Sequence, residues 1–158
     1  MAWQTPITDR VLQDAIEVRQ GVQNPKGAFR AEDWNRILGN EYHIQDLILE
    51  WKNILADIND LLEADDTSYP TDADFNKLAQ NIVLLCEATG YVPVGYVRPT
   101  TDFVGGSGSN AKRPSYIDIN AMELDLLLLK QMIDGAIAMW RRCGEVICSS
   151  NSQQIDIL

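Results

Sequence analysis

Apolar residues recur at the three- to four-residue spacing of an amphipathic helix in four stretches of this chain. They predict helices over about residues 8–20, 31–63, 72–88 and 116–142. Glycine or proline follows the first three of these stretches, as is usual where a helix ends. The sequence therefore predicts an all-α fold, a bundle of about four helices of which one is long.

The stretch at 31–63 has a seven-residue apolar period as well as a helical one. At 1.5 Å per residue an unbroken helix there would be roughly 50 Å long, whereas a compact domain of this size is nearer ~30 Å across. We therefore expect this helix either to bend near residues 50–53 or to project and meet a partner. The seven-residue period defines two rows of residues, or seams, along one face of this helix. One seam contains Ile37, Ile44, Trp51 and Ile58, and the other contains Asn40, Leu47, Ile54 and Leu61.

A short polar and apolar motif occurs three times, each time at the start of a predicted helix. An aspartate lies three residues after the first residue of the motif, an apolar residue and an asparagine follow, and a second amide or carboxylate comes five residues later. Repeats at this spacing occur both in solenoids and in bundles whose helices share one docking geometry. The polar members are Asp33, Asn35 and Asn40, then Asp74, Asn76 and Asn81, then Asp118, Asn120 and Asp125.

These repeated residues fit packing and capping better than a ligand site. Asp33, Asp74 and Asp118 can accept N–H groups of the first helical turn, and Thr71 and Ser115 can act as cap residues. Asn40, Asn81 and Asp125 fall on the apolar face, where a polar side chain needs a partner and can set the registry of packing. We therefore interpret the motif as a helix start joined to a docking element.

The remaining segments have no helical period. Residues 91–114 contain three prolines and the run Gly105–Asn110, which indicates a flexible loop. Within it, residues 91–97 could form an extended arm that docks on a neighbour. Residues 144–158 alternate short apolar pieces and are expected to be an extended tail, which leaves residues 1–143 as the helical domain.

The charge balance argues against two classes of partner. The net charge of −10 disfavours nucleic acid, whose phosphates need a basic face, and an anionic membrane surface. No run reaches the roughly 18 apolar residues of a membrane helix, and we expect no signal peptide in the opening residues.

The residues that usually carry chemistry are sparse and isolated. His43 has no second ligand at helical spacing, and the three cysteines lack C-x-x-C spacing, so free thiols are expected. The glycine-rich run ending at Lys112 does not have phosphate-loop spacing. We therefore expect a protein that is not an enzyme, with no catalytic residue, no cofactor and no metal.

Three segments resemble helical structural proteins from the virions of phages and prophages of Gram-positive bacteria. Trp3-Gln4-Thr5-Pro6 is similar to their Trp-x-Thr-Pro start. Residues 32–40 and 74–81 are similar to their acidic-x-Asn-Arg-Ile-x-x-Asn motif, and residues 118–147 resemble their last helix and its exit.

The resemblance implies a tail or baseplate-associated component, made in the bacterial cytoplasm and located in the virion. It would contact other virion or tail proteins and form a homo-oligomer such as a trimer. Trp3, Trp51 and Trp140 are the candidate interface residues, on the first arm and on the two long helices. The alternatives are a cytosolic helical adaptor or assembly chaperone, and an enzyme whose site is scattered across helices.

Overall fold

The protein is described here from a computed structural model that covers residues 2–24, 26–65, 67–106 and 109–151, with side chains as far as Cys143. The helices are α1 (Leu12–Arg19), α2 (Ala31–Lys52), α3 (Asp72–Thr89) and α4 (Tyr116–Asn151). Within these residues, extended pairing is limited to one antiparallel bridge between Val104 and Lys112. The predicted all-α bundle is confirmed.

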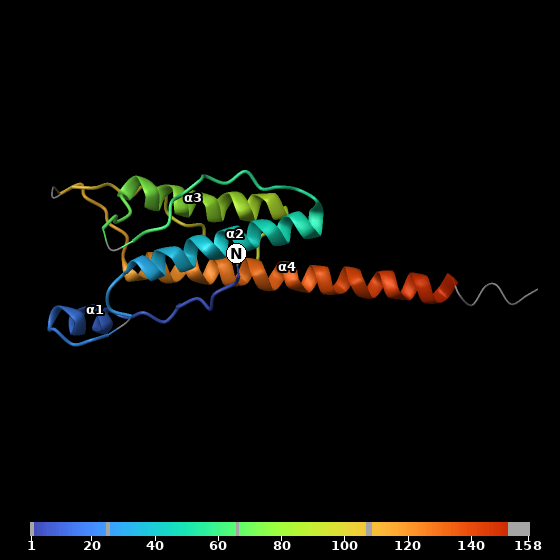
Figure 1. Ribbon diagram of the computed structural model, residues 1–158, viewed down its shortest axis with the longest axis horizontal. Coiled ribbons are helices and arrows are strands. Elements are labelled where there is room, and N and C mark those ends of the chain that lie inside the picture. The colour runs from blue at the N-terminus through green and yellow to red at the C-terminus, as the bar shows by residue number, and fades with distance from the viewer. Residues whose placement is uncertain (1, 25, 66, 107–108, 152–158) are drawn as a thin grey trace, which may run out of the picture.

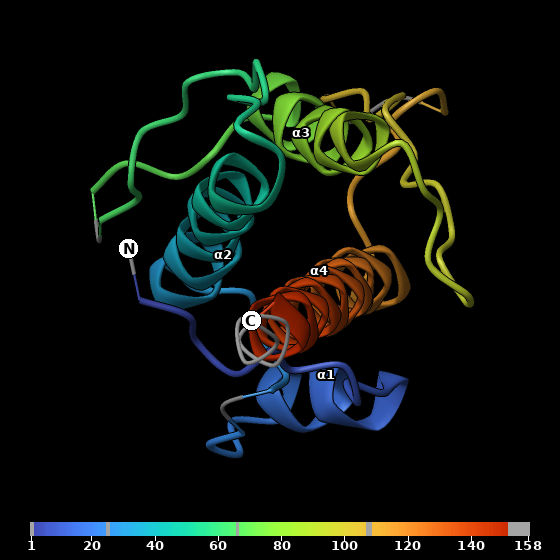
Figure 2. The same ribbon diagram turned by 90° about the vertical axis from the view of Figure 1, so that its right-hand side faces the viewer.

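Helices α2, α3 and α4 run parallel to one another and pack around a common axis (Figures 1 and 2). Their direction is also visible in the ion pairs between α2 and α4. Arg36 meets Glu123 near the start of both helices, and Glu50 meets Arg141 near the far end. Helix α1 lies outside this arrangement, beside α4, and none of its residues is buried.

Side chains from all three parallel helices fill the space along the axis. The largest fully buried ones include Ile37 and Ile44 of α2, Leu78 and Leu85 of α3, and Leu129 of α4. At the end where the helices start, Phe75 of α3 packs against Trp34 with ring centroids 5.3 Å apart. The motif thus places its apolar residue in the core at the same level of each helix.

Helix α2 is shorter than the sequence predicts, because it ends at Lys52 instead of near residue 63. Asn53 follows in the left-handed conformation, with φ 55° and ψ 35°, and its N–H donates to the carbonyl of Leu49. Asparagine tolerates this conformation better than most residues, so it can end a helix as glycine does. The chain then turns back along the bundle instead of projecting.

Helix α4 is longer than predicted and is the long helix of the fold. It continues to Asn151, so the expected extended tail is helical over residues 144–151, and residues 152–158 lie outside the described chain. At 1.5 Å per residue its 36 residues span about 54 Å, against about 33 Å for α2. Figure 1 shows α4 extending well past the ends of its two neighbours.

Three non-helical stretches, which we call the return segments, run back along the grooves between the parallel helices (Figure 2). They are residues 4–10, 59–64 and 97–103. The second precedes α3 and the third precedes α4, whereas α1 stands between the first and α2. The third lies within the predicted flexible loop, yet it is fixed to α3 and α4 by hydrogen bonds. The molecule is therefore a threefold-like repeat of a return segment followed by a helix.

Candidate functional site

The first aspartate of each motif copy caps its helix, as the spacing predicts. The Oδ2 atoms of Asp33, Asp74 and Asp118 accept the N–H groups three residues earlier, at 3.1, 2.9 and 2.8 Å. At Asp74, the hydrogen bonds from the Thr71 hydroxyl and N–H lower the pKa of the carboxyl. These carboxylates are engaged in local structure and leave little for ligand chemistry.

The asparagines of the motif bind the return segments through a pair of hydrogen bonds, and we call this two-bond contact a grip. In each case Oδ1 accepts the backbone N–H of one residue and Nδ2 donates to the carbonyl oxygen of that same residue, as a neighbouring β-strand would. The N–H contacts are 2.7–3.3 Å and the carbonyl contacts 2.8–3.0 Å. The pairs are Asn35 with Ala64, Asn40 with Gln4, Asn76 with Phe103, Asn81 with Asn59, and Asn120 with Arg10.

The grips follow a cyclic order around the bundle. Residues 4–10 are held by α2 at their start and by α4 at their end. Residues 59–64 are held in the same way by α3 and then α2, and residues 97–103 by α4 and then α3. The grips therefore attach each return segment to the two helices that flank it. Of the predicted registry residues, Asn81 also joins two helices, because it donates to Glu41 of α2 at 2.9 Å.

A buried cluster of four charged side chains joins the first return segment to α2 and α4. Arg10 contacts Glu123 at 2.9 Å and Asp33 at 2.8 Å, and Arg36 contacts the same two carboxylates at 2.7 and 2.6 Å. Burial alone would lower the pKa of the Arg36 guanidinium, but the hydrogen bonds to Glu123 and Asp33 raise it above its usual value. With two charges of each sign, the cluster is neutral as a whole.

The sequence does not predict this cluster, because the motif spacing singles out only Asp33 of the four residues, and only as a capping residue. One signal was available. Glu123 occupies the position in the third motif copy that Leu38 and Ala79 occupy in the first two, so a charge replaces an apolar residue on a buried face.

Glu41 is a further buried acid. Its carboxyl group is fully enclosed and accepts a hydrogen bond from Asn81 at 2.9 Å, while Oε1 has no partner among the described atoms. Burial raises the pKa of Glu41 well above its ordinary value, and the Asn81 contact offsets only part of this rise. Glu41 is thus part of the core rather than of an open site.

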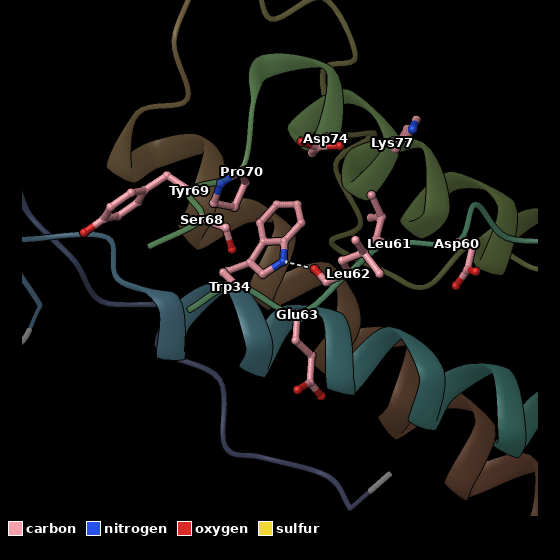
Figure 3. A pocket seen from close by; sticks show the side chains of 11 residues that line it. Trp34, Asp60, Leu61, Leu62, Glu63, Ser68, Tyr69, Pro70, Asp74 and Lys77 are labelled. Carbon is pink, nitrogen blue, oxygen red and sulfur yellow. Dashed lines mark hydrogen bonds between the residues drawn. The ribbon is translucent and has the colours of Figure 1, made fainter. Parts of the chain in front are cut away.

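A hollow of about 340 Å³ lies beside Trp34, between the second return segment and α3 (Figure 3). Two of its three acidic groups serve structural contacts: Asp74 caps α3, and Asp60 accepts the Tyr42 hydroxyl at 3.1 Å. The indole N–H of Trp34 donates to the Leu62 carbonyl at 3.0 Å. These residues stabilise the wall of the hollow and do not form a paired acid and base.

An apolar surface covers the end of the bundle from which α4 projects; we call it the end surface. Its main part is a hollow of about 640 Å³ between the Tyr91–Val94 turn and α4, and a smaller one of about 410 Å³ continues along α4. Val94 is 96% exposed, and Met139 and Trp140 are more than two-thirds exposed. Such a contiguous apolar area on a protein surface usually marks a place of contact with another molecule.

The three predicted interface tryptophans separate into two groups. Trp51 and Trp140 both line the smaller hollow of the end surface. Trp3 lies elsewhere, packed against His43 with ring centroids 5.7 Å apart and under the Lys130 ammonium at 5.5 Å. Trp3 therefore anchors the first return segment within its own chain, and His43 contacts its ring.

Some classes of site and partner can be checked directly. In the part of the chain that is described, no group of three or more His, Cys, Asp or Glu side chains is placed to hold a metal ion. Over the same residues, no helix is both long and apolar enough to cross a membrane. No protein-family model, curated protein or solved structure matches the chain.

Proposed function

We propose that this chain is a non-enzymatic structural component of a phage virion, associated with the tail or baseplate. It assembles with copies of itself and with other virion proteins through protein–protein contacts. The resemblance of its motifs to virion helical proteins supports the virion setting. The single observation that carries the assembly role is the end surface, where α4 leaves the bundle with an uncovered apolar face.

The uncovered face continues the buried seam of the bundle. Leu126, Ile133 and Trp140 are spaced by seven residues, and so are Leu129, Ala136 and Cys143. Leu126, Leu129 and Ile133 are fully buried, whereas Trp140, beside Trp51 at the end of α2, is 68% exposed. A coiled-coil seam of this kind is stable when another helix covers it.

We propose that a second copy of this chain covers the end surface. The projecting part of α4, about residues 137–151, is roughly 22 Å long and has the seam spacing that its own bundle uses. Two copies placed antiparallel would each lay this helix over the other's end surface. One twofold contact would then cover both apolar areas, as in an isologous dimer.

Mass spectrometry of purified, washed virions or induced prophage particles tests the virion role. We expect this chain in particles that contain the other tail proteins, and its absence from such particles would contradict the proposal. A cytosolic adaptor or assembly chaperone would give that second result, since it would be left behind when the particle is complete.

A matched pair of substitutions on α4 tests the contribution of the end surface to incorporation. Trp140→Glu places a charge on the exposed seam, while Ile117→Glu places one at an exposed position near the start of the same helix. We expect Trp140→Glu to reduce incorporation strongly and Ile117→Glu to leave it unchanged. Equal incorporation of both variants would contradict a role for the end surface.

A further inference from the structure

One of the six grip positions differs from the other five. Asp125 of α4 corresponds to Asn40 of α2 and Asn81 of α3, but it carries a carboxylate in place of an amide. Its Oδ1 accepts the N–H of Val97 at 3.0 Å, which reproduces one half of the asparagine grip. The second half needs a donor directed at the carbonyl oxygen of the same residue.

The second oxygen of Asp125 is enclosed and unpaired. The residue is 1% exposed, and Oδ2 has no hydrogen-bond partner among the described atoms. In the five asparagine grips, the corresponding atom is Nδ2, 2.8–3.0 Å from the carbonyl oxygen. By this correspondence Oδ2 faces the Val97 carbonyl, and a charged carboxylate would place two acceptors against each other.

We propose that Asp125 is a proton-dependent grip on the third return segment. With a proton on Oδ2, the carboxylic acid donates to the Val97 carbonyl and completes the same two-bond contact that the asparagines make. Without that proton, the two oxygens repel and residues 97–103 are held less tightly. The proton comes from solvent and returns to it, and no other bond changes.

The surroundings favour the protonated form. The Cys86 thiol on α3 and the hydroxyl of Tyr96, which precedes the third return segment, both interact with Asp125. Burial raises the pKa of both groups, so both are uncharged at neutral pH. Glu87 and Arg98 lie farther out and pair with each other at 3.6 Å. Burial raises the pKa of Asp125 to about 6, although the Val97 N–H partly offsets this.

The grip is connected to the end surface. The third return segment follows the Tyr91–Val94 turn, which forms one wall of that surface. Loosening of residues 97–103 would therefore loosen this wall. The connection to assembly rests on the proposed function, whereas the grip itself concerns contacts within one chain.

Amide hydrogen exchange at two pH values tests the grip on the full chain, whether or not the chain associates. After correction for intrinsic exchange, we expect residues 95–103 to exchange about tenfold faster at pH 7.5 than at pH 5. In Asp125→Asn, the amide completes the contact at both pH values, and the corrected rates should agree. Equal rates in the parent chain, or an unchanged pH effect in Asp125→Asn, would overturn the proposal.

Two further variants serve as controls in the same hydrogen-exchange experiment. Asn40→Asp places a carboxylate opposite the Gln4 carbonyl, so residues 4–10 should acquire the pH dependence that residues 97–103 show. Tyr96→Phe removes the nearby hydroxyl and should leave the pH dependence in place. Loss of the effect in Tyr96→Phe would mean that the tyrosine supplies the donor, and this would overturn the role of the Asp125 proton.

Discussion

At the scale of single residues, the buried asparagine side chains stabilise the fold by hydrogen bonding to backbone N–H and carbonyl groups of the return segments. Asn81 binds the N–H and carbonyl of the half-buried Asn59 and also donates to the fully buried Glu41. We expect Asn81→Leu to lower the free energy of unfolding by at least about 3 kcal/mol, because each buried polar group left unpaired costs about 1–3 kcal/mol. Urea denaturation measures this.

The exposed Asn110 provides the control for that change. Asn110→Leu should shift the free energy of unfolding by less than about 0.5 kcal/mol, as is usual for surface substitutions. A loss of similar size in both variants would contradict the role assigned to the Asn81 grip.

The buried charge cluster makes a second prediction at this scale. In Glu123→Gln, Arg10 and Arg36 keep Asp33 as their one carboxylate, so a positive charge is left uncompensated in the core. We expect a loss of about 3 kcal/mol in the free energy of unfolding, since breaking a buried ion pair on one side costs about 3–5 kcal/mol.

Asp134 provides the comparison for Glu123, because it pairs with Lys130 near the surface of the same helix. Asp134→Asn should cost at most about 0.5 kcal/mol, the usual value of an i,i+4 surface pair. Thermal denaturation of both variants at one salt concentration separates the two cases. Comparable losses would mean that the cluster does not depend on charge balance.

Residue roles were predictable where they are local, and less so where they depend on distant chain. Three residues of spacing place Asp33 at the first turn of its helix, and the hydrogen bond is there. The partner of Asn40 is Gln4, 36 residues away, and no periodicity indicates it. The sequence thus identifies the buried amides, but it does not indicate that their partners are the return segments.

At the scale of elements, the main error concerned the end of α2. Apolar residues continue at seven-residue spacing beyond Lys52, but Ile54 and Leu55 are about half or more exposed while Ala56 is buried. A return segment that packs between two helices also needs apolar residues. The spacing of these residues can continue the apolar period of the preceding helix, although the segment itself is not helical. The left-handed Asn53 is what ends the helix, and a periodicity argument does not detect it.

Asn53 therefore provides a test at this scale. A β-branched residue is strained in the left-handed conformation by roughly 1–2 kcal/mol, whereas glycine is not. We expect Asn53→Ile to lower the free energy of unfolding by about that amount and Asn53→Gly to leave it unchanged or slightly higher. If Asn53→Ile were harmless and extended the helical signal in circular dichroism, the assigned helix end would be wrong.

At the scale of the whole molecule, the buried acids predict how stability depends on pH. Burial raises the pKa of Asp125 to about 6 and the pKa of Glu41 well above its ordinary value, so both groups bind protons more tightly in the folded state. Their contribution to stability is complete below the unfolded pKa values and is lost as the pH rises through the folded ones. The free energy of unfolding should therefore fall between pH 4 and 7.

Urea denaturation at several pH values between 4 and 7.5 measures this slope. The contribution of Asp125 is at most about 3 kcal/mol, from a pKa that moves from 3.8 to about 6. Asp125→Asn should remove this part of the slope and leave the part due to Glu41. Stability that increases over the same range would contradict the assignment of both groups as buried acids.

We propose that another copy of the chain covers α4 and the end surface. Sedimentation equilibrium of the full chain measures this association. At about 100 µM we expect twice the 17.7 kDa mass of one chain, with Trp140→Glu reduced to a single mass and Ile117→Glu still doubled. A parent chain that remains at 17.7 kDa throughout this concentration range would contradict the account.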